Sequence, residues 1–400
     1  MKKSILLIVC LMIMTNAFSA PGQFVLNGKI QGIASGMAIL SYSVFKVDRW
    51  HQVKDSAQII QGNFLIKGMI DEPLKADIKI GDHVTSFYIE PATMNLYFPT
   101  KDLSEFTLNG SKTQDESELY VHNTMELDKL DNQLWKQYPK VNLDTIPEDN
   151  PLRKKFLDKI ESIDNQRDSL CELINNAKID FIRTNQNSFL PVIGDEITRL
   201  LYQRVDPISV GQARKLFNNL SEKVRHSTYG IRTNNRIKVK ENVVVGRLAP
   251  EFSTPDKNGK TVKLSGFRGR SYVMLDFWAS WCSPCLKGVP HLKQLFARYH
   301  DKGLEVICVS VDYKKDKWLS AIDKYDLSSW HHVLSVQDLD KSFQYIENKD
   351  DIREKYPLGN GVPQYILIDK TGKIIGKWDS YSEQNEQEQD KMLAEIFGEK

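Results

Sequence analysis

The segment Trp281-Cys282-Ser283-Pro284-Cys285 directly follows the apolar run Tyr272-Val273-Met274-Leu275-Asp276-Phe277-Trp278, with only Ala279 and Ser280 between them. This order predicts a buried strand, a short turn and a helix that begins at the cysteines. At a helix N-terminus, unpaired backbone N–H groups and the positive end of the helix dipole stabilise a thiolate. We therefore predict a disulfide-exchanging pair in which Cys282 is the nucleophile and Cys285 the resolving thiol. A C-x-x-C pair is also half of a zinc site, but the chain has no second pair.

The surroundings of the pair resemble the thioredoxin family, in particular its TlpA and ResA type, over roughly residues 243 to 400. Such domains have a central mixed sheet flanked by helices, so the resemblance implies an α/β thioredoxin-like C-terminal domain. Gly246 to Phe252 also resembles the G-x-x-A-P-x-F start that this type shares with the peroxiredoxins. Other matching positions are the buried aspartate Asp276, the tryptophans Trp278 and Trp281, the helix-kinking Pro290, and the cis-proline loop Gly361-Val362-Pro363-Gln364.

The resemblance implies roles for the matched residues. Asp276, semi-buried beneath the pair, is expected to accept the proton of Cys285, and the pair itself to form a redox-active disulfide. Pro363 is expected to keep metals from the dithiol, and no metal or cofactor is implied. The expected partners are disulfide-bearing proteins and a membrane thiol electron donor. The residues implied to line the substrate groove are Trp281, Pro284, Val362 and Pro363.

Two features differ from thioredoxin itself. Cys308 falls where cytosolic thioredoxins have a lysine beside the buried aspartate, so a proton relay through Asp276 must work without that lysine. The chain between Asp312 and Pro363 is also longer, and it predicts an additional helix over 315–325 and an apolar strand around 332–336. The TlpA-like type has an insertion of this kind.

Three alternative functions are open at this point. A peroxiredoxin needs Pro and Thr seven and three residues before its reactive cysteine, but this chain has Leu275 and Ala279 there. A copper carrier could use the cysteines with His331-His332, although the spacing within the cysteine pair is one residue short. A non-catalytic binding module would use the C-terminal domain only as a surface, and it would reduce no insulin disulfides.

Length and charge favour an exported, multidomain protein. The chain has 400 residues, more than a single core usually supports. Lys2 and Lys3, the apolar stretch 5–14 and the small residues Ala17 and Ser19 predict a signal peptide over 1–19 and a location in the periplasm or cell envelope. Without the two lysines the formal net charge falls from +2 to zero, so no nucleic-acid partner is expected.

Two further regions precede the redox domain. Residues 20–110 contain short apolar segments separated by Gly and Asn, which predicts a β-rich sandwich or barrel. This region resembles, less specifically, the β-rich module that precedes thioredoxin domains in many exported proteins of Bacteroidetes-type bacteria. We consider that two copies of the chain form a homodimer through this region. Ser111 to Gln114 has the form of a capping box, which predicts that helices begin here. The expected helices of this spacer, residues 111–241, are 115–135, 152–184, 188–201 and 207–226, and the redox domain is 242–400.

The remaining cysteines and one basic stretch predict no separate site. Cys171 lies in a helical pattern and Cys308 in the apolar strand 304–311, and we expect buried, inert thiols rather than a second bridge. Residues 214–240 have eight basic side chains against Glu222 alone. A solvated helix face explains such a stretch, and an acidic partner or lipid surface is the alternative.

Overall fold

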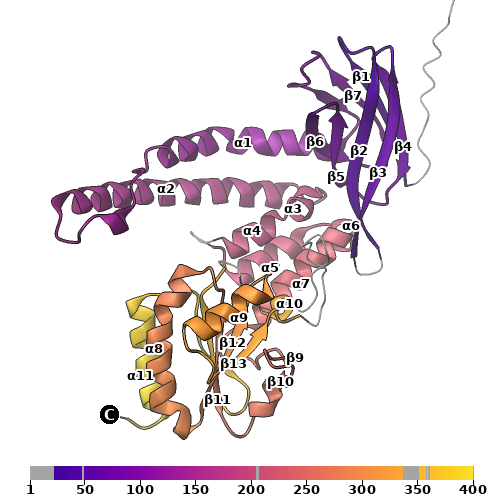
Figure 1. The fold of residues 1–400 in the computed structure, drawn as a ribbon. Helices are drawn as coiled ribbons and strands as arrows, with labels where there is room; N and C mark the ends of the chain where they lie inside the picture. Colours follow the sequence, from indigo (N-terminus) through magenta and orange to yellow (C-terminus); the bar gives the residue numbers. More distant parts are fainter. Residues whose placement is uncertain are drawn as a thin grey trace, which may run out of the picture. The chain divides into compact units, whose positions relative to one another are not determined.

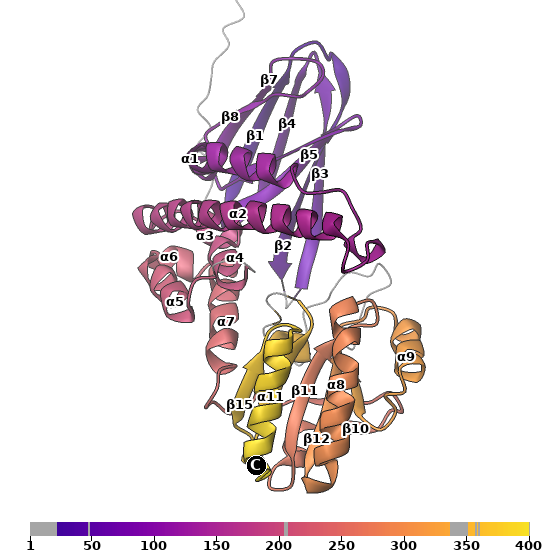
Figure 2. The ribbon, with the colours of Figure 1, turned by 90° about the vertical axis from the view of Figure 1, so that its left-hand side faces the viewer.

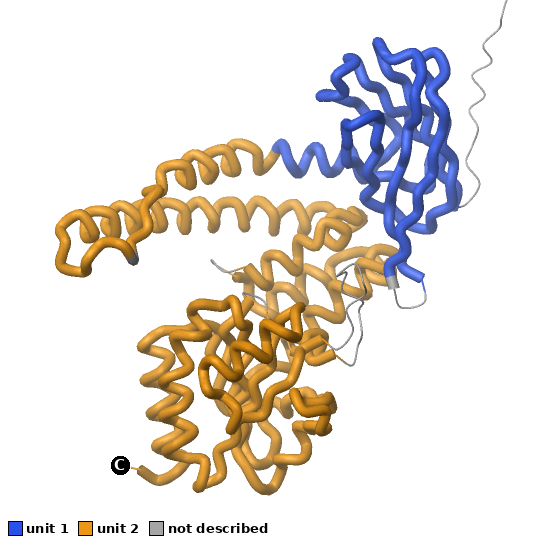
Figure 3. The backbone as a smooth tube through the Cα atoms, in the orientation of Figure 1, with its two compact units in different colours: residues 1–122 blue, residues 123–400 orange. Residues whose placement is uncertain are grey.

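The computed structural model describes residues 22–46, 49–203, 207–336, 351–356, 358 and 361–399. The chain divides into two compact units, residues 1–122 and 123–400 (Figure 3). The expected signal peptide lies outside the described residues. Within them, no helix is both long and apolar enough to cross a bilayer.

The first unit is built on one eight-stranded sheet (Figure 1). Its strands are β1 (Gln23–Ile30), β2 (Ser35–Lys46), β3 (Arg49–Ile60), β4 (Asn63–Met69), β5 (Leu74–Ile80), β6 (His83–Ile89), β7 (Thr93–Phe98) and β8 (Thr107–Asn109). They lie in the order β6-β5-β2-β3-β4-β1-β7-β8, and the pairs are antiparallel except β1 with β7. The β-rich class predicted for this region is confirmed.

The sheet curls on itself around an aromatic cluster. Phe106, just before β8, has its ring centroid 6.1 Å from that of Phe98 on β7 and 6.1 Å from that of Phe87 on β6. Since β6 and β7 belong to opposite ends of the sheet, one ring can touch both only if the sheet bends round. Alternate residues of β5, from Leu74 to Ile80, point into this core and are buried. The architecture is therefore closer to a barrel than to a sandwich of two separate sheets.

The first helix starts at Ser111 as predicted, but its cap differs from the predicted box. Gln114 N donates to Ser111 Oγ at 3.1 Å, which is the expected half of the motif. The Gln114 side chain does not reach back to the cap; its Oε1 accepts from Tyr88 N at 3.1 Å. The Glu90 carboxylate accepts from the next free amides, those of Lys112 and Thr113. The capping-box prediction is therefore correct for Ser111 and wrong for Gln114.

The structure confirms the helices predicted over 115–135 and 152–184, and it divides each of the other two predicted helices. Its helices are α1 (Lys112–Trp135), α2 (Pro151–Thr184), α3 (Leu190–Ile193), α4 (Glu196–Tyr202), α5 (Val210–Asn219), α6 (Glu222–Arg225) and α7 (Thr228–Asn242), with a 3-10 turn, η1 (Leu143–Thr145). The single helix predicted over 188–201 is wrong, because Asp195 adopts a left-handed conformation with φ 59° and breaks it. The single helix predicted over 207–226 is also wrong, because Leu220 is extended and ends α5.

Much of the basic stretch 214–240 is used inside this region. Arg214 forms a two-bond ion pair with Glu241, and Arg236 pairs with Asp195 at 2.6 Å. Lys240 donates to the Leu201 carbonyl at 2.8 Å. These three side chains hold α4, α5 and α7 together, so this part of the stretch is not the solvated helix face that was expected.

The C-terminal region has the mixed sheet with flanking helices that the sequence predicts. The strands β11 (Tyr272–Trp278), β12 (Leu304–Ser310), β13 (His331–Leu334), β14 (Gln364–Ile368) and β15 (Ile374–Trp378) lie in the order β13-β12-β11-β14-β15. β11, β12 and β13 are parallel, and β14 is antiparallel to β11 and β15. The other elements are β9 (Ser253–Pro255), β10 (Thr261–Lys263), η2 (Leu264–Phe267), α8 (Ser283–Tyr299), η3 (His300–Lys302), α9 (Lys315–Lys324), α10 (Ile352–Lys355) and α11 (Glu383–Ile396).

Alternate residues of β11 face different layers. Met274, Asp276 and Trp278 face the layer formed by α8, α9 and α11, while Val273, Leu275 and Phe277 face the segment 243–267 and α10. Figure 2 shows α8 and α11 side by side over the strands. The predicted additional helix and strand are α9 and β13, and β13 adds to the parallel edge of the sheet. Because β11, β12 and β13 are parallel, the segments that follow them meet at one edge.

Candidate active site

The two cysteines lie where β11 ends and α8 begins. They form a disulfide with a Cα–Cα distance of 5.3 Å. Cys282 is the N-cap residue of α8, and its sulfur accepts a hydrogen bond from Cys285 N at 3.2 Å. Pro284 occupies the first turn, where its missing N–H costs nothing. The sulfur of Cys282 thus sits at the free amides and positive end of a 17-residue helix, which favours its thiolate in the reduced protein.

A second loop approaches the disulfide from the start of β14. The Val362–Pro363 peptide bond is cis, and the Val362 carbonyl oxygen lies 3.5 Å from Cys282 Sγ. Cys282 and Cys285 are each only 4% exposed, whereas Trp281 is 65% exposed. The structure therefore brings the expected groove residues Trp281, Val362 and Pro363 together around the Cys282 sulfur.

Asp276 lies on the inner side of the pair, on the strand that leads to it. It is buried rather than semi-buried, with 6% of the residue exposed. Burial raises the pKa of its carboxyl from 3.8 to about 7, and a hydrogen bond from Cys308 Sγ at 3.5 Å acts weakly in the opposite direction. A carboxyl that titrates near neutral pH can both take and return a proton under ordinary conditions.

Cys308 is the cross-strand neighbour of Asp276 on β12. Burial and the nearby carboxylate raise the pKa of the Cys308 thiol, so it remains protonated and can donate. Cys308 is a free buried thiol, as predicted, and Cys171 is free but partly exposed, contrary to the expectation that it is buried. The lysine position of thioredoxins is therefore occupied by a neutral hydrogen-bond donor.

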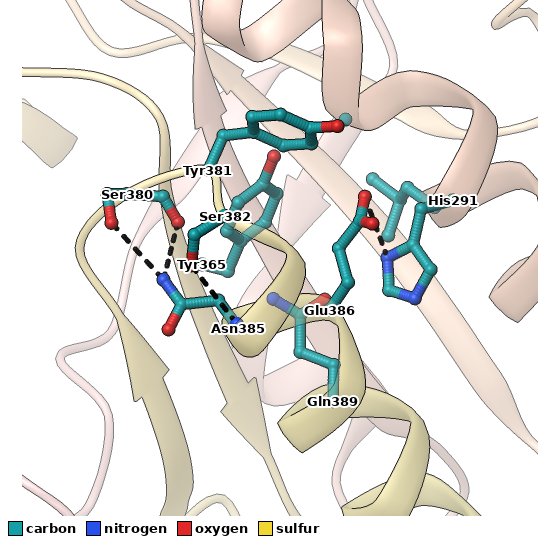
Figure 4. Close-up of a pocket in the computed structure, with 10 residues that line it drawn as sticks. His291, Tyr365, Ser380, Tyr381, Ser382, Asn385, Glu386 and Gln389 are labelled. Atoms are coloured by element: carbon teal, nitrogen blue, oxygen red, sulfur yellow. Dashed lines mark hydrogen bonds and ion pairs between the residues drawn. The ribbon is translucent and has the colours of Figure 1, made fainter. Parts of the chain in front are cut away.

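A small pocket lies between α8, α11 and β14 (Figure 4). Tyr365, the cross-strand neighbour of Asp276 on β14, lines it together with His291 and Glu386. A Cβ atom on Gly288 would lie 2.6 Å from the Tyr365 hydroxyl, so a larger residue at this position of α8 would require Tyr365 to move. The pKa of Tyr365 is raised by burial and by Asp276, which keeps the phenol neutral.

A buried network that sequence reasoning missed holds the turn before Cys282. The Asp312 carboxylate accepts from Ser280 N at 2.9 Å and from Ser280 Oγ at 2.6 Å. It also accepts from Ser310 Oγ at 2.7 Å. Asp312 is 8% exposed, so these charge-assisted bonds are shielded from water. The end of β12 therefore fixes the backbone two residues before the nucleophile.

The histidine pair is not arranged to bind a metal ion together with the dithiol. His332 is buried and its Nε2 donates to the Leu327 carbonyl at 2.7 Å. Burial lowers its pKa to about 4, so it is neutral. His331 points toward Glu305, with its Nε2 3.5 Å from the carboxylate. Among the described residues, no cluster of three His, Cys, Asp or Glu side chains could hold a metal ion.

Comparisons with known proteins agree with this geometry. Residues 245–386 match the AhpC/TSA family, and residues 24–117 match a domain of unknown function, DUF4369. The thiol-disulfide oxidoreductase ResA of a Bacillus cereus strain is 32% identical over 138 residues, which cover 34% of this chain and 71% of that protein. ResA of Bacillus thuringiensis subsp. konkukian is 34% identical over 135 residues, 34% of this chain and 69% of that protein.

One solved structure is the thioredoxin domain of a thiol-disulfide oxidoreductase from Bacteroides vulgatus. It is 30% identical, covers 38% of this chain and 99% of that domain, and has a TM-score of 0.31. From the sequence relatives, the chain belongs to the ResA family of thiol-disulfide oxidoreductases. The protein is therefore an oxidoreductase enzyme with a thioredoxin-like C-terminal domain and an additional β-rich domain.

Proposed function

We propose that Cys282 and Cys285 are the exchanging dithiol of a protein-disulfide reductase or isomerase. The observation that carries this proposal is the disulfide at the N-terminus of α8, whose Cys282 sulfur faces the cis-proline loop and accepts from Cys285 N. In the reduced protein, the Cys282 thiolate attacks a substrate sulfur and releases a thiolate. The Cys285 thiol then loses its proton and attacks Cys282, which releases the second substrate thiolate and restores the disulfide.

We propose Asp276 as the acceptor of the Cys285 proton. A carboxyl with a pKa of about 7 is a competent base near neutral pH, and it lies on the strand that runs beneath the pair. A bridging water could connect the two groups. We also propose that Trp281, Pro284, Val362 and Pro363 line the groove that guides a substrate strand toward the sulfur, which the contact between the Val362 carbonyl oxygen and Cys282 Sγ supports.

We propose electron flow from the protein to its substrates. Strong oxidants of this fold stabilise their reduced thiolate with a histidine before the second cysteine, but this chain has Pro284 there. The reduction potential should therefore lie nearer roughly −270 mV than about −120 mV. Such a protein needs re-reduction in an oxidising compartment, for which we propose a membrane thiol donor.

Export rests on residues 1–19, and we propose a mature N-terminus near Ala20 in the periplasm or cell envelope. The same proposal assigns residues 20–110 to a β-rich domain, 111–241 to a helical spacer and 242–400 to the redox domain. N-terminal sequencing of the protein from the envelope fraction tests the processing. Recovery of intact Met1 would contradict export with cleavage.

Insulin-disulfide reduction with dithiothreitol as the electron source tests the activity. Wild type should reduce insulin, Cys282→Ser should not, and Cys285→Ala should accumulate a mixed disulfide that non-reducing gels resolve. Cys171→Ala is the matched control, because it removes a free thiol outside the site, and it should keep full activity. No reduction by wild type would favour the non-catalytic binding module.

A further inference from the structure

The segment after β12 has charged and aromatic side chains and starts next to Asp312, which binds the turn before the disulfide. We call Tyr313, Lys314, Lys315 and Lys317 the basic rim; all four are exposed, and Tyr313 is 47% exposed. The rim follows directly after Asp312, whose carboxylate binds Ser280. Since Ser280 is two residues before Cys282, the rim begins within about 10 Å of the chain that carries the nucleophile.

The three lysines of the rim are not used for internal ion pairs. None of them pairs with a carboxylate in the part of the chain that the structure describes. By contrast, on the other side of the mouth the carboxylate of Asp379 is held by Lys377 at 2.9 Å and by the Gln364 amide at 2.6 Å. Within the described residues, the three lysines of the rim therefore have no carboxylate partner, whereas Asp379 has two donors.

The local sequence places these charges against helix preference. Lys314 is the N-cap of α9 and has no side-chain cap hydrogen bond; Lys315 and Lys317 lie in the first turn, where only Asp316 is acidic. The positive end of a helix dipole disfavours cations there, so the lysines weaken α9 rather than stabilise it. A local conflict of this kind is typical of positions that serve binding rather than folding.

An aromatic side chain adds contact area to this charge. The Tyr313 hydroxyl accepts from Arg353 Nη1 at 3.1 Å, which fixes the ring at the edge of the rim. Trp281, which follows Ser280 in the sequence, is 65% exposed. Exposed aromatic side chains that are held in place bind a polypeptide with little loss of side-chain freedom.

We infer that the basic rim binds an acidic segment of the substrate polypeptide, close in sequence to the cysteine that Cys282 attacks. This inference rests on the proposed function and names its substrate class: disulfide-bearing proteins with Asp or Glu near the reactive cysteine. Carboxylates on the substrate would lie over the lysines while the adjacent sulfur enters the groove beside Val362. The attraction raises the encounter rate and sets the direction in which the substrate strand lies.

The test uses three short peptides, each closed by one disulfide, that differ only in having two Glu, two Gln or two Lys beside the first cysteine. Reduction is followed with dithiothreitol as the neutral electron source. Wild type should show a kcat/KM about tenfold higher for the Glu peptide than for the Gln peptide at low salt, and lowest for the Lys peptide. High salt should remove the difference.

The variant K314Q/K315Q/K317Q should lose the preference for the Glu peptide and reduce the Gln peptide as wild type does. Its fold is not at risk, because the substitutions remove cations from a helix N-terminus. The matched control K260Q/K370Q/K373Q changes the net charge equally, and Lys370 and Lys373 lie in the β14–β15 turn at the opposite edge of the sheet. The control should keep the preference.

A cysteine-free, fluorescently labelled Glu peptide separates this inference from the proposed function. Its anisotropy should report binding to oxidised wild type and to the control, and about tenfold weaker binding to the rim variant. If wild type bound this peptide but reduced no disulfide, the proposed function would be wrong and the rim would stand. Equal kcat/KM for the Glu and Lys peptides, or a preference that survives in the rim variant, would overturn the inference.

Discussion

Replacing Asp276 with Asn should change how the stability of the redox domain depends on pH. Asp276 is buried on β11, the strand that leads to the disulfide, and burial raises the pKa of its carboxyl from 3.8 to about 7. In the native state its charged form is therefore disfavoured. Asn has nearly the same shape, can accept the Cys308 hydrogen bond through its amide oxygen, and does not ionise. The comparison isolates the cost of the buried charge.

The size of the change in the free energy of unfolding follows from the shift in the pKa of Asp276. A change from 3.8 to about 7 is roughly three pKa units, and each unit corresponds to about 1.4 kcal/mol. Between these two values the native state holds one more proton than the unfolded state, so the free energy of unfolding falls as pH rises. The stabilising contribution is complete below about pH 4 and is lost by about pH 7. Relative to wild type, Asp276→Asn should gain about 4 kcal/mol across this range.

Urea unfolding of the oxidised protein at a series of pH values measures this difference. Tryptophan fluorescence is a suitable signal, because Trp278, Trp318, Trp330 and Trp378 are buried in the C-terminal core. The control is Asp326→Asn, which removes a carboxylate whose side chain is 93% exposed, and its difference from wild type should stay nearly constant. If the Asp276→Asn difference were flat between about pH 4 and pH 8, the carboxyl would titrate near its ordinary value, and its role as a neutral-pH base would be refuted.

Three further outcomes follow from the site. Cys308→Ala removes the thiol that donates to Asp276, so the pKa of the carboxyl should rise further. The pH–rate profile of insulin reduction should then move to higher pH by as much as about one unit. Cys308→Ser keeps a hydrogen-bond donor and should shift the profile less. Asp312→Asn weakens the charge-assisted bonds to Ser280, so the free energy of unfolding in urea should fall by about 1–3 kcal/mol, and kcat/KM should fall too. Unchanged values would show that the turn is held without the Asp312 carboxylate. Iodoacetamide should label Cys282 before Cys285 in the reduced protein because Cys282 lies at the helix N-terminus, and peptide mass mapping identifies the labelled cysteine. Faster labelling of Cys285 or Cys308 would reverse the assignment.

The sequence predicts the C-terminal fold well because its signals are contiguous. The run from Tyr272 to Cys285 contains a buried strand, a turn and a helix start, and each is determined by residues next to it. The predicted position of Cys308 beside Asp276 also holds, since parallel strands in register bring such pairs together. Local sequence patterns predict structure well here because the pairing of the neighbouring strands favours the same conformation.

Two features that sequence reasoning missed depend on partners distant in sequence, whereas the failed helix predictions have local causes. Gln114 was expected to complete a local cap, but Tyr88, 26 residues earlier, offers its amide to the same side chain. Asp312 and Ser280 are 32 residues apart, and only the pairing of β11 with β12 brings them together. Nothing next to Asp312 in the sequence indicates a contact with the Ser280 backbone. The left-handed Asp195 likewise gave no periodic signal, although Gly194 before it is a common helix breaker.

The replacement of a lysine by Cys308 bears on how Asp276 works in both directions of exchange. A lysine beside the aspartate would stabilise the carboxylate and lower its pKa, whereas a thiol donates one weak hydrogen bond and adds no charge. Near neutral pH the carboxyl is then present in both states. The ionised state can take the proton of Cys285 when the mixed disulfide is resolved. The protonated state can supply one when a donor thiolate attacks Cys282 and Cys285 leaves. If Asp276 has the role proposed above, it serves both steps equally, so the direction of electron flow must be set by the stability of the Cys282 thiolate and by the electron donor.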